Sequence, residues 1–251
     1  MSGETVVSAA DPAIPGWYGK IPYLGDFASR RLPQAFIDAW DTWLRHSLAA
    51  SRATLGVRWL EVYLNSPIWR FALMPGLVEE TAWAGLVMPS VDKVGRHFPL
   101  TLAAPIEGRG EVIAAALAAA QDWYAQLERV ALAVLDIDFS PEQLESEMAA
   151  LPFPAQSEAA PDLSAAQLAQ WWQGSASGCL IVLPEPDALP ELLTAAAHRL
   201  FAAAGSGKTL WWTVAPAGGP TPLYCFTGLP PEDRYAALLQ GTQIFPETTP
   251  G

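Results

Sequence analysis

Two apolar runs with strand-like composition lie on either side of a short polar segment in the first half of the chain. The runs are residues 84–88 and 100–104, and the polar segment, residues 89–99, reads PSVDKVGRHFP. Apolar runs joined by a connector rich in Gly and Pro predict two strands and a loop held by a sheet. Such loops often carry binding residues. Two interpretations are open: a functional loop, or a solvated turn whose charges contribute little.

Helical and strand patterns alternate along the rest of the chain. Apolar residues recur at helical spacing from Phe36 to Leu48, and Gly56 is expected to end that helix. Other strands are predicted at residues 16–23, 66–73, 178–183, 210–215 and 223–227, and other helices at 111–134, 141–148, 164–172, 189–203 and 230–240. This alternation predicts an α/β fold in which helices cover a mixed sheet.

The domain organisation is predicted from composition. Residues 1–15 and 244–251 are expected to be tails that flank one domain, residues 16–243. The connector at residues 151–162, LPFPAQSEAAPD, could instead divide two lobes. One domain is preferred because neither side of the connector has an obvious complete sheet.

Hydrophobic residues make up 51% of the 251 residues, which is enough for a large core. The chain has no apolar run of about 18 residues, so no membrane insertion is expected. The first residues lack the basic start and apolar core of a secretory signal, which predicts a cytoplasmic protein. Cys179 and Cys225 each lie in a predicted strand, and we expect both to be reduced, buried thiols, although neighbouring strands could be bridged in an oxidising compartment.

Charge is unevenly distributed between the two halves. Residues 1–110 hold ten basic and ten acidic residues, whereas residues 111–251 hold four basic and sixteen acidic, which accounts for the whole net charge of −12. Nucleic acid and anionic membranes are therefore not expected as partners of the second half. A site for an anionic group is expected in the first half.

The sequence offers little support for catalysis or cofactor binding. Residues 205–209, GSGKT, resemble the end of a P-loop, but Ala202 stands where the leading Gly is required. The predicted order is also helix then strand, so we interpret the segment as a turn. Asp26 with Lys93 or His97 could form an acid–base pair, but the sequence does not show that they are adjacent. The other histidines and the two cysteines have no metal-site spacing, and no catalytic residue, metal or cofactor is expected.

Three segments of the first half together carry a family resemblance. They are GWYGKIPYLGDFASRRLP (16–33), SPIWRFAL (66–73) and GLVMPSVDKVGRHFPLTLAAPI (85–106), with LWWT at 210–213 in support. In this order they resemble the TagF (ImpM) family of type VI secretion accessory proteins. The candidate site residues that fall on the family pattern are Lys20, Gly25, Asp26, Phe27, Arg30, Ser66, Trp69, Arg70, Ser90, Asp92, Lys93, Gly95 and Arg96. The family often has Arg where this chain has Lys93, which keeps the charge but not bidentate hydrogen bonding.

The resemblance implies a cytoplasmic three-layer α/β/α domain without catalytic activity. It further implies a post-translational repressor that binds another component of the secretion apparatus, with a forkhead-associated scaffold protein as the leading candidate. An alternative is an anion- or phosphopeptide-binding module that uses the basic residues of the 19–31 and 89–99 segments. The resemblance does not predict an oligomeric state.

The charged candidate residues have two possible roles. Buried charges require partners, so the candidate cations could form an internal salt-bridge network that holds loops on the sheet. They could equally form a surface for a partner. We expect Arg96 and Asp26 to hold the 89–99 loop against the 19–27 loop, and the joined loops to present the partner surface; the effect on stability depends on whether the pair is substantially buried. A closed network would favour the structural role, and an open pocket with free guanidinium groups would favour anion binding.

Overall fold

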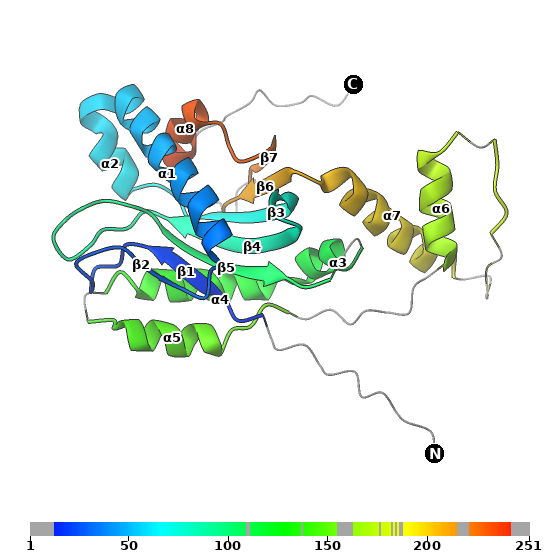
Figure 1. The fold of residues 1–251 in the computed structure, drawn as a ribbon, viewed down its shortest axis with the longest axis horizontal. Helices are drawn as coiled ribbons and strands as arrows, with labels where there is room; N and C mark the ends of the chain where they lie inside the picture. The colour runs from blue at the N-terminus through cyan, green and yellow to red at the C-terminus, as the bar shows by residue number, and fades with distance from the viewer. Residues whose placement is uncertain are drawn as a thin grey trace, which may run out of the picture.

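The computed structural model describes residues 13–108, 111–136, 138–154, 163–175, 177–181, 183, 185, 188–214 and 221–241. Its described strands form one seven-stranded sheet in the order β2-β1-β5-β4-β3-β6-β7. Their bounds are β1 Gly16–Gly19, β2 Ala28–Arg30, β3 Trp69–Val78, β4 Thr81–Met88, β5 Leu100–Ile106, β6 Lys208–Trp212 and β7 Leu223–Thr227. The predicted α/β class is confirmed (Figure 1).

The pairing differs from the mixed sheet that we expected. All the strand pairs of the sheet are antiparallel. The reason lies in the connections, because β1–β2, β3–β4, β4–β5 and β6–β7 are each neighbours both in sequence and in the sheet. Neighbours joined in this way pair antiparallel, whereas a parallel pair needs a crossover connection.

One face of the sheet is covered by α1 (Gln34–Leu55), α2 (Trp59–Leu64) and α8 (Tyr235–Gln240) (Figure 1). The predicted apolar stripe of α1 is buried, and Trp40 packs against Phe71 of β3 and Trp211 of β6 with ring centroids 4.7 and 5.9 Å apart. Gly56 ends α1 as predicted, with a φ of 53° that favours glycine. The short helix η1 (Gly56–Arg58) joins α1 to α2.

The other face is covered by α3 (Glu111–Ala119), α4 (Gln121–Ala133) and α5 (Pro141–Ala149), which completes three layers (Figure 1). The single helix predicted over 111–134 is therefore wrong, because Ala120 leaves the helical conformation between α3 and α4. Alanine has the highest helix propensity, so this break arises from tertiary packing, in which α3 packs on α7 and α4 on the sheet. The predicted capping box of Ser140 and Gln143 at the start of α5 is confirmed.

The second half contributes α6 (Leu163–Gln173), α7 (Leu189–Gly205), η3 (Glu232–Arg234) and the strands β6 and β7. A small apolar cluster joins α6 to α7. The strand predicted at 178–183 is wrong, because the described residues 178–181 and 183 are irregular. Within the described part of the chain, no helix is long and apolar enough to cross a membrane.

The two thiols differ from our expectation. Cys179 lies in the irregular segment and Cys225 lies in β7, and both are exposed and free. The prediction of two buried thiols is therefore wrong. For Cys225 the strand itself is as predicted, but its side chain points to the uncovered side of an alternating strand.

The predicted division into one domain and two tails stays a prediction. Residues 1–12 and 242–251, which include most of the expected tails, lie outside the described residues.

Candidate functional site

Two loops from neighbouring strands meet at one end of the sheet. The 20–27 loop joins β1 to β2, and the 89–99 loop joins β4 to β5. Because β1 pairs with β5, the end of β1 lies beside the start of β5. At that point a Cβ on Gly19 would lie 2.1 Å from the Pro99 carbonyl oxygen, and the φ of Gly19 is 134°. Glycine is therefore required for the close approach of the two loops.

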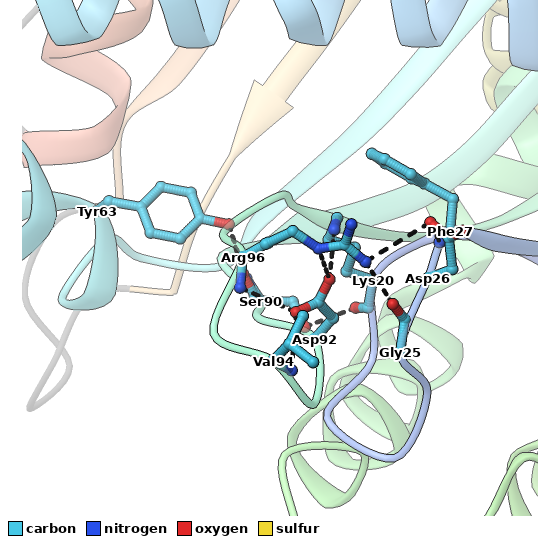
Figure 2. A network of polar contacts seen from close by, with 9 residues as sticks. All are labelled: Lys20, Gly25, Asp26, Phe27, Tyr63, Ser90, Asp92, Val94 and Arg96. Atoms are coloured by element: carbon cyan, nitrogen blue, oxygen red, sulfur yellow. Dashed lines mark hydrogen bonds and ion pairs between the residues drawn. The ribbon is translucent and has the colours of Figure 1, made fainter.

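Asp92 is the centre of the polar network between these loops (Figure 2). Its Oδ2 accepts hydrogen bonds from Lys20 Nζ at 2.5 Å and from Arg96 Nε at 2.7 Å. Its Oδ1 accepts from the backbone N–H groups of Arg96 at 2.8 Å and Val94 at 3.1 Å. Lys20 and Asp92 are both buried, each 3% exposed. The network is closed, because both carboxylate oxygens and both charges have partners.

The same contacts fix the ionisation of Asp92. Burial alone would raise the pKa of this carboxyl group, but the hydrogen bonds from Lys20, Arg96 and Val94 outweigh burial and hold the pKa well below its usual range. Asp92 is therefore a charged structural partner at neutral pH. A carboxylate held in this way is poorly suited to general acid–base chemistry, which needs a pKa near the working pH.

Tyr63 and Ser90 support the base of the 89–99 loop. The Tyr63 hydroxyl donates to the Ser90 carbonyl oxygen at 2.8 Å and accepts from the Ser90 N–H at 2.9 Å. The Ser90 hydroxyl donates to the Lys20 carbonyl oxygen at 2.6 Å. Burial raises the pKa of Tyr63, so its hydroxyl stays protonated as this arrangement requires. Sequence reasoning missed Tyr63, because an aromatic residue among apolar neighbours resembles ordinary core.

Further contacts tie the two loops together. The Lys93 N–H donates to the Leu24 carbonyl oxygen at 3.0 Å, and the Arg96 guanidinium donates to the Gly25 carbonyl oxygen. Phe27 packs edge-on against Phe98 with ring centroids 4.7 Å apart. Gly95 has a φ of 85°, which a turn at the loop tip requires.

Asp26 lies on the outer rim rather than in the network. Its side chain is 82% exposed, and its Oδ1 is 3.7 Å from Nη2 of Arg96, which is itself 54% exposed. The expected Arg96–Asp26 contact is therefore present only as a solvated pair, and the buried partner of Arg96 is Asp92. Asp92 takes that position because it lies beneath Arg96 and faces the Lys20 ammonium, whereas Asp26 faces solvent and accepts a hydrogen bond from the Phe27 N–H at 2.8 Å.

The remaining candidate residues lie elsewhere. Arg70 points to the face of the sheet that α4 covers. There its Nε and Nη2 donate to the Glu128 carboxylate at 2.8 and 2.9 Å. Trp69 Nε1 donates to the Leu238 carbonyl oxygen at 3.0 Å. The Ser66 hydroxyl donates to the Pro67 carbonyl oxygen at 3.3 Å, and Arg30 is exposed on β2. These four residues therefore do not belong to the paired loops.

Another ion pair, between Arg31 and Glu145, was not suggested by the sequence. It links the start of the sheet to α5. Glu145 accepts hydrogen bonds from Trp17 Nε1 at 2.6 Å and from the Arg31 guanidinium. Burial would raise the pKa of Glu145, but the Trp17 and Arg31 hydrogen bonds outweigh it and lower the pKa. The carboxylate that Arg31 contacts is more than a hundred residues away in the sequence, so spacing gave no signal.

The GSGKT segment is a turn, as expected. It runs from the last residue of α7 through a turn into the first residues of β6. Lys208 Nζ donates to the Ala204 carbonyl oxygen at 2.6 Å, and the Thr209 hydroxyl donates to the Gly228 carbonyl oxygen at 2.8 Å. Both groups that a P-loop would offer to phosphate and Mg²⁺ are engaged in the fold. The described residues contain no group of three or more His, Cys, Asp or Glu side chains that could hold a metal ion.

The sheet and its paired loops define an α/β protein in which a structural charge network holds two loops together. The TagF N-terminal domain family, described as type VI secretion system-associated, matches residues 16–151. This match covers more than half of the chain and includes both loops, so the chain belongs to the TagF family. It is accordingly an accessory protein of type VI secretion.

The crystal structure of PA0076 from Pseudomonas aeruginosa PAO1 is similar to this chain. The two share 33% sequence identity and superpose with a TM-score of 0.73, over 94% of this chain and 99% of that one. The likeness therefore extends through the second half, beyond the residues that the family match covers. No curated protein matches the chain.

Proposed function

We propose that this protein is a non-enzymatic, cytoplasmic repressor of type VI secretion that acts post-translationally by binding another component of the apparatus. A forkhead-associated scaffold protein is the leading candidate for that component. The paired loops, residues 20–27 and 89–99, form the binding surface. The observation that carries the proposal is that a buried network fixes these loops while their outer side chains remain free for contact.

The outer side of the paired loops has the composition of a protein-binding surface. Tyr23, Phe27 and Val94 are 45, 42 and 68% exposed, and Lys93 is exposed beside them in the sequence. Aromatic residues and Arg are enriched in interfaces, and Arg96 contributes a guanidinium that is half exposed. Because the Lys20–Asp92 pair holds the loops in place, binding would cost little ordering of the backbone.

The alternative of anion or phosphopeptide binding has less support. Lys20 and Arg96 both donate to Asp92, so these two cations are already paired. Arg70, another candidate cation, is paired with Glu128 on another face. On the 89–99 loop Lys93 remains as an exposed cation, and as an isolated ammonium it lacks the bidentate geometry that favours phosphate.

The test is a binding titration with the purified forkhead-associated scaffold protein of the same secretion system. Val94→Asp places a charge on the exposed loop tip while keeping the backbone N–H that donates to Asp92. Tyr23→Ala removes an aromatic from the neighbouring loop. Each should weaken binding by about tenfold or more, the effect of losing roughly 1.4 kcal/mol. The same variants should relieve repression in a secretion assay.

Val57→Asp is the matched control, since Val57 is fully exposed outside the loops. If the unaltered protein does not bind the scaffold, the proposed partner is wrong. If it binds and neither loop variant weakens binding, the proposed surface is wrong.

A further inference from the structure

The two edges of the sheet are protected differently. The β2 edge has three residues, includes Arg30, and is followed by Arg31 with a φ of 59° and by Pro33. Shortness, charge, an irregular backbone and proline are the features that prevent an edge strand from pairing with another chain. The β7 edge, LYCFT, has five residues without charge or proline. This edge therefore lacks the protection that the other one has.

The backbone groups that β7 offers on its outer side can be identified. The Gly228 N–H donates to the Gly207 carbonyl oxygen at 2.7 Å, and the same register pairs Lys208 with Thr227. In an antiparallel ladder the groups of alternate residues point to opposite sides. The N–H and C=O groups of Leu223, Cys225 and Thr227 therefore point away from β6. Within the part of the chain that the structure describes, β7 has no strand beyond it.

We propose that β7 pairs with β7 of a second copy of this chain, antiparallel and about a two-fold axis at Cys225. In this register Cys225 faces the second copy's Cys225, and Leu223 faces the second copy's Thr227. Each outward N–H group of these residues then donates to a C=O group of the second copy, and each outward C=O group accepts from an N–H group of that copy. A two-fold interface of this kind uses the same strand on both copies and closes as a dimer.

Charge and proline positions restrict the contact between two copies to this strand and this register. The chain carries a net charge of −12, so two copies repel each other over most surfaces. The β7 edge carries no charge, and pairing about Cys225 places no like charges opposite each other. Pro222 and Pro230 flank the strand and cannot donate to a ladder, which confines the pairing to residues 223–227.

Apolar surface beside the strand adds to the contact. Leu223 is 58% exposed and lies at the rim of an open apolar hollow of about 440 Å³, which Trp212 and the exposed Phe201 also line. A short strand pair buries less than the roughly 1,600 Å² of a typical stable interface, so neighbouring apolar surface is needed. The hollow is on the face of β7 that carries Leu223, where the second copy's Thr227 would approach.

This inference is independent of the proposed function. The order of the sheet places β7 at one edge and β1 and β2 at the other, so the dimer leaves the paired loops accessible (Figure 1). A dimer would present two such loop surfaces on one particle.

The first test is the mass of the full chain in solution, measured by light scattering over a concentration series. The unaltered protein should have twice its monomer mass of 26.9 kDa. Cys225→Lys places two ammonium groups opposite each other at the axis and should raise the dimer dissociation constant by at least about tenfold. Val57→Lys is the matched control and should dimerise normally, since Val57 is exposed outside β7.

The register is tested by cross-linking with a short bis-maleimide. A Cys179→Ser variant retains Cys225 and should form a cross-linked dimer, whereas Cys225→Ser should not. Thr227→Glu, whose side chain is exposed on the same strand, should also weaken the dimer if Cys225→Lys proves to be unfolded. A monomer at every concentration, or a dimer that the folded variants at 225 and 227 leave intact, would overturn the proposal.

Discussion

Asp92 and Asp26 lie in the two paired loops and both approach Arg96, but Asp92 is on the inner face of these loops and Asp26 is on their outer rim. The two carboxylates therefore differ in exposure and in hydrogen bonding. On the inner face, Asp92 is 3% exposed and receives four hydrogen bonds. On the outer rim, the Asp26 side chain is 82% exposed and lies 3.7 Å from Arg96. The same residue type, beside the same cation, is a structural partner in one place and a solvated charge in the other.

The difference shows that surroundings, rather than residue type, decide what an ion pair contributes. A solvated pair is screened and contributes about 0–1 kcal/mol to stability. Removing one member of a buried pair strands a desolvated charge, which costs several times more. Arg70 and Glu128, with side chains 6 and 20% exposed, are closer to the buried case but lie on a different face of the sheet.

The largest expected effect is on the inner face. Lys20→Met keeps much of the side-chain volume but leaves Asp92 without its buried cation. We expect the free energy of unfolding to fall by about 3 kcal/mol, at the low end for a broken buried pair because Arg96 still contacts Asp92. Lys20 also lies 4.6 Å from the centroid of the Phe27 ring, and that cation–π contact would be lost.

Chemical denaturation of Lys20→Met beside Lys93→Met is the measurement. Lys93 is an exposed lysine in the neighbouring loop, and its loss should change stability by no more than about 0.5 kcal/mol. Equal effects of the two substitutions would contradict the contrast between the faces.

The next effect is a graded loss of stability in acid. The folded protein holds the pKa of Asp92 below its usual value, so the pair contributes fully above the unfolded pKa of about 4 and is lost as pH falls through the lowered folded pKa. Stability should therefore decline progressively below about pH 4. Glu145, whose pKa is also lowered, adds to the same decline.

Thermal melting of the unaltered protein and of Asp92→Asn, compared between neutral and acid pH, checks this prediction. Asp92→Asn removes the titrating group, so its melting temperature should depend less steeply on pH. An equal slope in both proteins would show that the acid response comes from other carboxylates.

The sequence predicted elements that depend on local pattern. The stripe of α1, the strand β7 and the capping box at Ser140 follow from spacing and residue type within a few positions. Prediction from the sequence failed where tertiary packing determines the conformation, as at Ala120, which interrupts a run of strong helix formers. It also failed at residues 178–183, where an apolar run resembled a buried strand but did not join the sheet.

The candidate site was predicted as a set of residues but not as a geometry. Lys20, Asp92 and Arg96 were all named, and the structure brings them together. Their pairing could not be predicted, because Lys20 lies in one loop and both carboxylates of the pattern were available to Arg96. For Arg70, the alternation of side chains along the strand did not show which face of the sheet it would occupy. Its partner on α4 had no sequence signal.

Arg96 spans both faces of the paired loops, so its loss should have an intermediate effect. Arg96→Ala removes the Nε bond to Asp92 and the bond to the Gly25 carbonyl oxygen, but Lys20 and two N–H groups still hold Asp92. Because Arg96 is half exposed, we expect a loss of about 1 kcal/mol in unfolding free energy. A loss as large as that of Lys20→Met, in the same denaturation assay, would mean that Arg96 rather than Lys20 stabilises Asp92.

The smallest effect is expected at Asp26, and it separates structure from recognition. Asp26→Ala removes a solvated, 3.7 Å contact with Arg96, so stability should change by no more than about 0.5 kcal/mol. In a double-mutant cycle, Asp26→Ala and Arg96→Ala should be additive within about 0.5 kcal/mol, since the pair is weakly coupled. A coupling energy above 1 kcal/mol, on the order found for residues in one network, would restore the Arg96–Asp26 pair as the link between the loops. Because Asp26 lies on the proposed binding surface, the same variant can alter scaffold binding while its stability is unchanged, and that combination would place Asp26 at the interface rather than in the fold.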